Sequence, residues 1–204
     1  MAWYSWFSTI YDQALEDLYA PHRVRAFAEV NPGHRKVLLL PCGTGQDLAP
    51  LLPRLAPDPD LLCIDLDPGM LAKARARGSR GCRFVQAPAS ELSSHVEPAS
   101  LDLVVFSLGL SVVPEHESVL RSALSRLRPG GQCLIFDCWA ERRNLNSWPV
   151  EWMAQADLSR TPFRILEAEC SDYRFTPLPD AKPLQFGGTL YVATGTRRAQ
   201  SKPP

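Results

Sequence analysis

The spacing of apolar residues along the chain predicts strands that alternate with helices. Short apolar runs, typical of buried strands, occur at residues 37–41, 61–65, 82–86, 102–107 and 132–137. The segments between several of them, at residues 47–55, 69–77 and 116–127, have the pattern of helices. Because such alternation forms parallel sheets, we predict an α/β fold with a doubly wound, mostly parallel sheet.

The beginning of the chain is predicted to be helical. Residues 3–19 place apolar and aromatic side chains at helical spacing, with acidic residues between them, which indicates an amphipathic helix. We expect Pro21 to end this helix and a second helix to run from His22 to about Val30. Residues 1–34 thus precede the core, and we expect them to form a helical lid.

The end of the chain departs from the alternation. Residues 163–175 and 186–196 are predicted as two strands, and the proline-rich linker between them leaves no room for a crossover helix. They should therefore pair antiparallel, as a C-terminal hairpin. We predict a single domain over residues 1–204, with the core over residues 35–197 and a frayed tail over residues 198–204.

Composition agrees with one enzyme-sized domain. The 204 residues include 22 Lys plus Arg and 22 Asp plus Glu, so no positive field attracts nucleic acid, and we expect no nucleic-acid substrate. The absence of a long apolar run or a signal-peptide pattern favours a cytoplasmic protein. The six cysteines form no Cys-x-x-Cys pair, so we expect reduced thiols and no metal.

A candidate ligand site lies at residues 37–48, VLLLPCGTGQDL, where an apolar run ends in a Gly-x-Gly turn that leads into a helix. Gly43 and Gly45 allow a ligand to approach the backbone closely. Asp65 ends the next apolar run, about twenty residues on, where a ribose-binding carboxylate is expected. No Lys follows the second glycine and Leu48 replaces the third glycine of a dinucleotide loop, so we predict a nucleoside ligand without a pyrophosphate.

These residues resemble the first motif of class I S-adenosylmethionine-dependent methyltransferases. The resemblance continues in CIDLDPGMLAKARAR, RFVQAPASEL and LDLVVFSLGLSVVPEHESVLRSALSRLRPGGQCLIFD, and covers about residues 36–197. It implies a seven-stranded Rossmann-like sheet and the cofactor S-adenosylmethionine, which becomes S-adenosylhomocysteine, without a metal. The segments SLGLSVVP, LRPGG and FDCW are most similar to small methyltransferases of quinones and lipid headgroup amines. The implied reaction is in-line transfer of a methyl group to nitrogen or oxygen, less readily carbon, of a small or amphiphilic acceptor.

The resemblance also implies site residues. Asp65 is expected to bind both ribose hydroxyls, whereas we interpret Asp67 as the cap of the next helix. The residues expected at the cofactor are Pro41, Cys42, Gly43, Thr44, Gly45, Asp65, Leu66, Met70, Ala89 and Ser107. The residues expected at the acceptor are Tyr11, Leu108, Ser111 and Trp139, with Tyr11 and His22 as catalytic candidates. Core packing remains an equal alternative for Leu66, Met70, Tyr11 and Trp139, and a surface position for His22.

Three departures from the family pattern bear on function. Leu39 stands where the family often has an acidic residue, Pro41 where it has a glycine, and Pro88 where an adenine-contacting aspartate is common. They leave open whether cofactor binding is weakened, and they motivate the alternative of a non-catalytic S-adenosylmethionine-binding regulator or subunit. An oxidoreductase is a third alternative, against which the missing third glycine argues. The acceptor, the number of methyl transfers and the oligomeric state stay open; we expect peripheral membrane contact at most.

Overall fold

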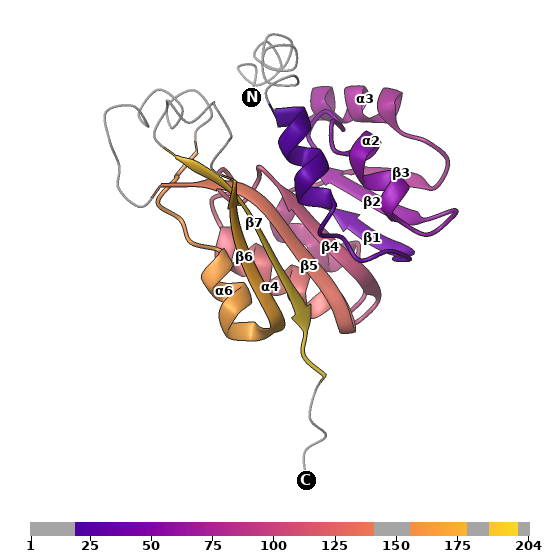
Figure 1. Ribbon diagram of the computed structural model, residues 1–204. Helices are drawn as coiled ribbons and strands as arrows, with labels where there is room; N and C mark the ends of the chain where they lie inside the picture. The colour runs from indigo at the N-terminus through magenta and orange to yellow at the C-terminus, as the bar shows by residue number, and fades with distance from the viewer. Residues whose placement is uncertain (1–18, 141–155, 179–187, 200–204) are drawn as a thin grey trace.

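The computed structural model describes residues 19–140, 156–178 and 188–199, and a seven-stranded sheet runs through them (Figure 1). The strand order is β3-β2-β1-β4-β5-β7-β6. The strands are β1 (Lys36–Leu39), β2 (Asp60–Asp65), β3 (Cys82–Gln86), β4 (Leu101–Ser107), β5 (Leu127–Trp139), β6 (Cys170–Leu178) and β7 (Thr189–Arg197). Adjacent strands among β1, β2, β3, β4 and β5 pair in parallel, whereas β7 runs antiparallel to both β5 and β6. The predicted fold class, with its C-terminal antiparallel pair, is confirmed.

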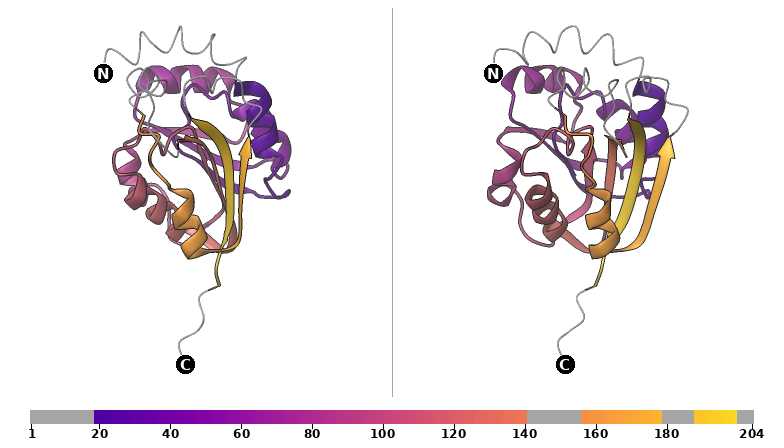
Figure 2. Two further views of the ribbon diagram at one scale, coloured as in Figure 1. Left: turned by 60° about the vertical axis from the view of Figure 1, so that its left-hand side comes forward. Right: turned by 90° about the vertical axis from the view of Figure 1, so that its left-hand side faces the viewer.

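Helices cover both faces of this sheet (Figure 2). They are a helix over residues 19–27, α2 (Leu48–Leu51), the 3-10 turns η1 (Leu52–Arg54) and η2 (Ala89–Ser94), α3 (Pro68–Arg77), α4 (His116–Arg126) and α6 (Phe163–Glu169). The helix over residues 19–27 lies on one side, together with α2 and α3, and α4 and α6 lie on the other. The sheet therefore has a hydrophobic core on each face.

Strand β1 shows how the sequence specifies both cores. Val37 and Leu39 pack into the cluster beneath the helix over residues 19–27, and Leu38 packs into the cluster beneath α4. All three side chains are fully buried. A strand in the middle of a parallel sheet is covered on both faces, which explains its continuous apolar run. Each such side chain stabilises the fold by about 1.5–3 kcal/mol.

One predicted strand is wrong over half its length. Residues 163–169 form α6 instead of the first part of a strand, and β6 begins at Cys170. In a helix Phe163 and Leu166 lie on the same side, three residues apart, and both are buried, whereas a strand would turn them to opposite faces. The antiparallel pairing of the two C-terminal strands was nevertheless predicted correctly.

The predicted break at Pro21 is also wrong. A continuous helix covers residues 19–27 and includes Pro21. Proline loses one N–H donor in a helix, but its fixed φ is compatible with helical geometry. Tyr11 and most of the predicted lid lie outside the described residues, so the division into lid, core and tail stays a prediction. No described helix has the length and apolar character needed to span a membrane.

The position of the candidate site follows from the strand order. The chain forms β1 in the middle of the sheet, adds β2 and β3 on one side, and then returns to place β4 on the other side. In open α/β sheets, ligands bind outside the carboxyl ends of the strands at such a reversal. The glycine loop follows β1 directly and therefore lies at this reversal of strand order.

Candidate active site

The two glycines of the loop after β1 have different surroundings. Both have a positive φ, +51° at Gly43 and +80° at Gly45. A Cβ on Gly43 would meet no atom within 4 Å, whereas a Cβ on Gly45 would lie 2.9 Å from the Cα of Ala74 in α3. Gly43 thus leaves room for a ligand beside the backbone, and Gly45 lets α3 pack closely against the loop.

The carboxylate of Asp65 lies beside this loop at the end of β2. Its Oδ2 accepts a hydrogen bond from the backbone N–H of Gly43 at 2.8 Å, and its Oδ1 accepts one from the N–H of Asp67 at 3.0 Å. Burial raises the pKa of Asp65, and the two backbone hydrogen bonds oppose this shift. Each carboxylate oxygen has a second lone pair. The group therefore keeps two acceptor sites, which is the number that a ribose diol needs.

The residues after Asp65 divide between helix capping and the site surface. Asp67 accepts hydrogen bonds from the backbone N–H groups of Gly69 and Met70 at 2.7 and 2.9 Å, which confirms it as the cap of α3. Leu66 is 58% exposed, so the core-packing alternative is wrong for this residue. Met70 is half-buried. An exposed leucine beside Asp65 is available to cover an apolar ligand group.

Two contacts hold the glycine loop against its neighbours. Arg77 from α3 donates to the carbonyl oxygen of Thr44 at 3.2 Å and to its Oγ1 at 3.0 Å. On the other side, a Cβ on Gly109 would lie 2.1 Å from the Cδ of Pro41, so the loop after β4 packs against this proline ring. The peptide bond between Leu40 and Pro41 is cis. Pro41 thus has a structural role, although the family has a glycine there.

A buried polar cluster adjoins the loop on the β4 side. Asp47 accepts hydrogen bonds at Oδ1 from Ser107 Oγ and from Arg23 Nε, both at 2.9 Å. Sequence reasoning expected Ser107 at the cofactor but missed Arg23 and Asp47. The charge of Asp47 right after the glycines was a usable signal, whereas no local pattern pointed to Arg23. His22, next to Arg23, is 8% exposed, so the expected surface alternative for this histidine is wrong.

Comparison with known proteins agrees with this geometry. Residues 37–131, from β1 into β5, match a family model described as a methyltransferase domain. This segment is similar to methyltransferase domains, in agreement with the resemblance of its motifs to class I S-adenosylmethionine-dependent methyltransferases. The matched residues include the glycine loop, Asp65 and Ser107.

The curated relatives of this chain are named for different acceptors. A trans-aconitate 2-methyltransferase from Deinococcus radiodurans is 34% identical over 128 residues, which are 62% of this chain and 47% of that protein. A ubiquinone/menaquinone biosynthesis C-methyltransferase from Idiomarina loihiensis is 35% identical over 107 residues, which are 50% of this chain and 42% of that protein. The chain thus spans less than half the length of either relative. The similarity does not single out one branch of the superfamily.

Solved structures show the same fold over nearly the whole chain. A methyltransferase from Thermotoga maritima, described as a possible histamine N-methyltransferase, superposes with a TM-score of 0.71 at 17% identity. The match covers 97% of this chain and 99% of that one. At this identity the likeness establishes the fold alone, and it includes the C-terminal strands beyond the family match.

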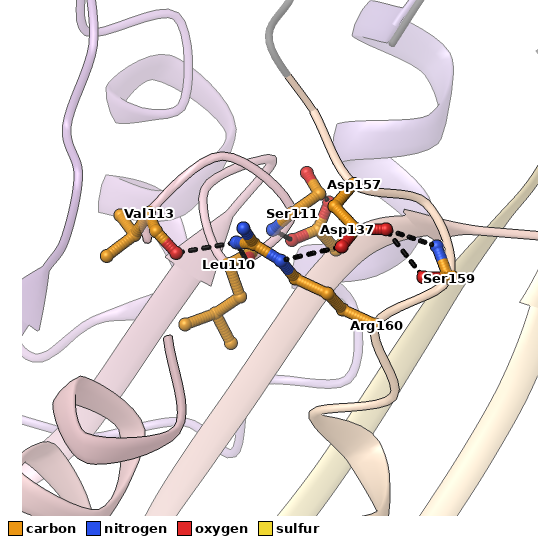
Figure 3. Close-up of polar contacts among 7 residues, drawn as sticks. All are labelled: Leu110, Ser111, Val113, Asp137, Asp157, Ser159 and Arg160. Atoms are coloured by element: carbon orange, nitrogen blue, oxygen red, sulfur yellow. Dashed lines mark hydrogen bonds and ion pairs between the residues drawn. The ribbon is translucent and has the colours of Figure 1, made fainter. Parts of the chain in front are cut away.

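The region where the acceptor was predicted is organised around Asp137, at the carboxyl end of β5 (Figure 3). Its Oδ1 accepts from Ser111 Oγ at 2.8 Å, and its Oδ2 accepts from the Ser111 backbone N–H at 3.0 Å. Asp137 is 1% exposed, and burial raises its pKa. The predicted acceptor residue Ser111 therefore directs its hydroxyl to a buried carboxylate.

Residues 157–160 contact the loop after β4, which contains Ser111 (Figure 3). Arg160 donates through Nη1 to the carbonyl oxygens of Leu110 at 2.9 Å and Val113 at 2.5 Å. The backbone N–H of Asp157 donates to the carbonyl oxygen of Ser111 at 2.8 Å. Hydrogen bonds thus hold the loop after β4 at Leu110, Ser111 and Val113. Sequence analysis did not predict these contacts.

The remaining predicted site residues take different positions. Leu108 is half-buried with a positive φ of +50°, and its N–H donates to the Phe136 carbonyl oxygen at 2.7 Å. Trp139 packs edge-on against Phe163 and Phe175, with ring centroids 5.5 and 6.3 Å apart, as the core-packing alternative described. Ala89 is half-buried at the start of η2.

All six cysteines are free thiols. Cys42 and Cys63, next to each other at the cofactor end, are buried. A hydrogen bond with Cys63 and burial raise the pKa of the Cys42 thiol, and burial raises the pKa of Cys138 to about 12. The thiols of Cys42 and Cys138 therefore stay protonated at neutral pH, which disfavours nucleophilic chemistry at these two residues.

Proposed function

We propose that this protein transfers a methyl group from S-adenosylmethionine to a nitrogen or oxygen atom of a small or amphiphilic acceptor. The observation that carries the proposal is the Asp65 carboxylate, hydrogen-bonded to Gly43 at the point where the glycine backbone is open. It lies at the reversal of strand order, where this fold binds ligands. The similarity of residues 37–131 to methyltransferase domains supports the same assignment.

The residues beside the glycine loop fit the cofactor. Asp65 offers two acceptor sites for the ribose hydroxyls, Gly43 leaves room beside the backbone, and exposed Leu66 is suited to cover adenine. When bound, S-adenosylmethionine supplies a methyl group that its sulfonium has already activated. The protein then has to orient the acceptor and exclude water, and such positioning supplies much of a rate enhancement.

The acceptor end supports a substrate that arrives ready to react. Ser111 and Asp137 are bonded to each other, and Arg160 is bonded to backbone carbonyls. These groups hold the loop and are not placed to remove a proton. An unprotonated amine or an anionic oxygen needs no such base. The predicted catalytic roles of Tyr11 and His22, the helical lid, the cytoplasmic location and the exclusion of nucleic acid remain proposals.

Calorimetric titration with S-adenosylmethionine tests the cofactor site, with an Asp65→Ala variant beside the wild type. We expect the variant to lose about 1–3 kcal/mol of binding free energy, the cost of a hydrogen bond to a charged group. Transfer of labelled methyl groups to carboxylates, amines, phenols and tRNA then tests catalysis. Binding without transfer to any acceptor favours the non-catalytic regulator, and absence of binding to the wild type overturns the proposal.

A further inference from the structure

The buried cluster beside the glycine loop joins three distant segments. Arg23 comes from the helix over residues 19–27, Asp47 from the turn after the two glycines, and Ser107 from the end of β4. Their exposed fractions are 7%, 5% and 6%. Ser107 Oγ and Arg23 Nε donate to the same oxygen of Asp47. A charged pair this deeply buried is costly unless its hydrogen-bonding groups find partners.

One nitrogen of this cluster lacks an acceptor within the described part of the chain. Arg23 Nη1 is buried and makes no hydrogen bond there. Leaving such a donor unsatisfied costs about 1–3 kcal/mol, and more when the group is charged. Buried polar groups nearly always have partners, so an unmatched one beside a candidate ligand site marks a position where a bound group can complete the set. An anionic oxygen satisfies a guanidinium best.

The cluster and Asp65 lie on opposite sides of the same loop. Asp65 ends β2 and Ser107 ends β4, and β1 lies between these two strands in the sheet. A ligand laid along the loop therefore meets a diol-binding carboxylate at one end and the pair of Arg23 and Asp47 at the other. The second end offers one donor and one carboxylate, which matches the zwitterion of an α-amino acid.

The replacement of an acidic residue by Leu39 strengthens the argument. Leu39 is fully buried in the apolar cluster and cannot accept a hydrogen bond. The first strand therefore contributes no carboxylate to the candidate site, although the resemblance to the family leads one to expect it there. Asp47 lies eight positions further along the chain and brings a carboxylate to the far side of the loop.

We infer that Arg23 and Asp47 bind the α-amino acid end of the cofactor, with Ser107 positioning Asp47. Arg23 Nη1 donates to the cofactor carboxylate, and the Asp47 carboxylate accepts from its ammonium group. This inference rests on the proposed function. It makes the helix over residues 19–27 part of the cofactor site.

Two ligands that differ only at this end test the inference by calorimetry. S-Adenosylhomocysteine carries the amino acid, and 5′-methylthioadenosine lacks it. We expect Arg23→Met and Asp47→Asn to weaken binding of S-adenosylhomocysteine about ten- to hundredfold and to leave binding of methylthioadenosine within about twofold of the wild type. Ser107→Ala, which keeps the ion pair, should act in the same direction with a smaller loss.

Arg54→Met is the matched control. Arg54 donates to the carbonyl oxygens of Ala28 and Val30 at 3.0 and 3.4 Å, and so supports the same helix away from the loop. Its variant should leave the ratio of the two affinities unchanged.

Equal weakening of both ligands by Arg23→Met, Asp47→Asn and Ser107→Ala would overturn the inference, because it would show a structural role only. Equal affinity of the wild type for the two ligands would overturn it as well, while the proposed function would stand. If the wild type binds neither ligand, the proposed function fails together with the inference.

Discussion

The two halves of the candidate site, the predicted cofactor half around Asp65 and the predicted acceptor half around Asp137, are held together in different ways. At the cofactor half, the carboxylate of Asp65 is bonded to backbone N–H groups of Gly43 and Asp67. At the acceptor half, the carboxylate of Asp137 is bonded to Ser111, and the side chain of Arg160 is bonded to carbonyls about fifty residues away. The exposed fraction of Asp65 is 8%, whereas that of Asp137 is 1%.

This difference predicts opposite sensitivities. The glycine loop depends on backbone conformation and close approach, so a single added methyl group is expected to disturb it. The acceptor loop depends on a buried charge and its partners, so removal of a side chain is expected to disturb it. Substitutions that add or remove single groups therefore distinguish the two halves.

The largest effect is expected from Asp137→Ala in the acceptor half. It leaves the N–H and hydroxyl of Ser111 without their acceptor in a buried place. We expect a loss of about 3–5 kcal/mol in the free energy of unfolding, because each unsatisfied buried group costs about 1–3 kcal/mol. Urea denaturation measures it. A loss below about 1 kcal/mol would show that the loop does not depend on this carboxylate.

A pair of glycine variants tests the cofactor half. Gly45→Ala combines a positive φ with a close contact to Ala74, and we expect a loss of about 2–4 kcal/mol in stability. Gly43→Ala has only the backbone cost, about 1–2 kcal/mol, but its methyl group points into open space where the ligand is expected. Thermal unfolding and S-adenosylmethionine titration on both variants should separate the effects. If both variants lost affinity for S-adenosylmethionine in the same proportion to their loss of stability, the two glycines would not have separate roles.

Stability should also depend on pH through Asp137. Burial raises its pKa above the ordinary value of 3.8 in the folded state. At a pH between the pKa of Asp137 in the unfolded chain and its raised pKa in the folded protein, the folded protein holds a proton that the unfolded chain releases. Stability therefore falls as pH rises through this range, by up to about 1.4 kcal/mol per pH unit. The contribution is complete below the unfolded pKa. Urea denaturation from pH 4 upward should show a flatter profile for Asp137→Asn, and parallel profiles would count against a raised pKa.

The smallest stability effect is expected from Arg160→Ala, at about 1 kcal/mol. Loss of its two hydrogen bonds frees the carbonyls of Leu110 and Val113, so amide exchange in residues 108–113 should accelerate. Arg83→Ala is the matched control, since its ion pair with Asp60 is about half-exposed and contributes little. Unchanged exchange in the Arg160 variant would show that residues 157–160 do not restrain the loop.

The elements and contacts around Asp65 were easier to predict from the sequence than those around Asp137, for a physical reason. Gly43, Gly45 and Asp65 follow apolar strands at short, regular spacing, and strand β3 has the predicted bounds of residues 82–86 because turns flank a compact apolar run. Arg23 and Arg160 act through long side chains on partners in other segments. Nothing in their local sequence distinguishes them from surface arginines.

The prediction of the C-terminal region failed for a related reason. Ile165 and Leu166 are typical of a strand when considered alone, but α6 buries them against the sheet. Short apolar segments are ambiguous between helix and strand until their packing partner is known. The hairpin itself was predictable, because the linker after β6 is too short to cross the sheet.

The contact between Pro41 and Gly109 couples substitutions at these two positions. Because the proline ring occupies the space that a side chain at position 109 would need, any residue larger than glycine is tolerated there only after position 41 has changed. The reverse order, with position 41 changed first, leaves a gap that a later substitution at position 109 can fill. Mutational routes through this loop therefore have a direction, and a library that varies position 109 alone should yield almost exclusively glycine.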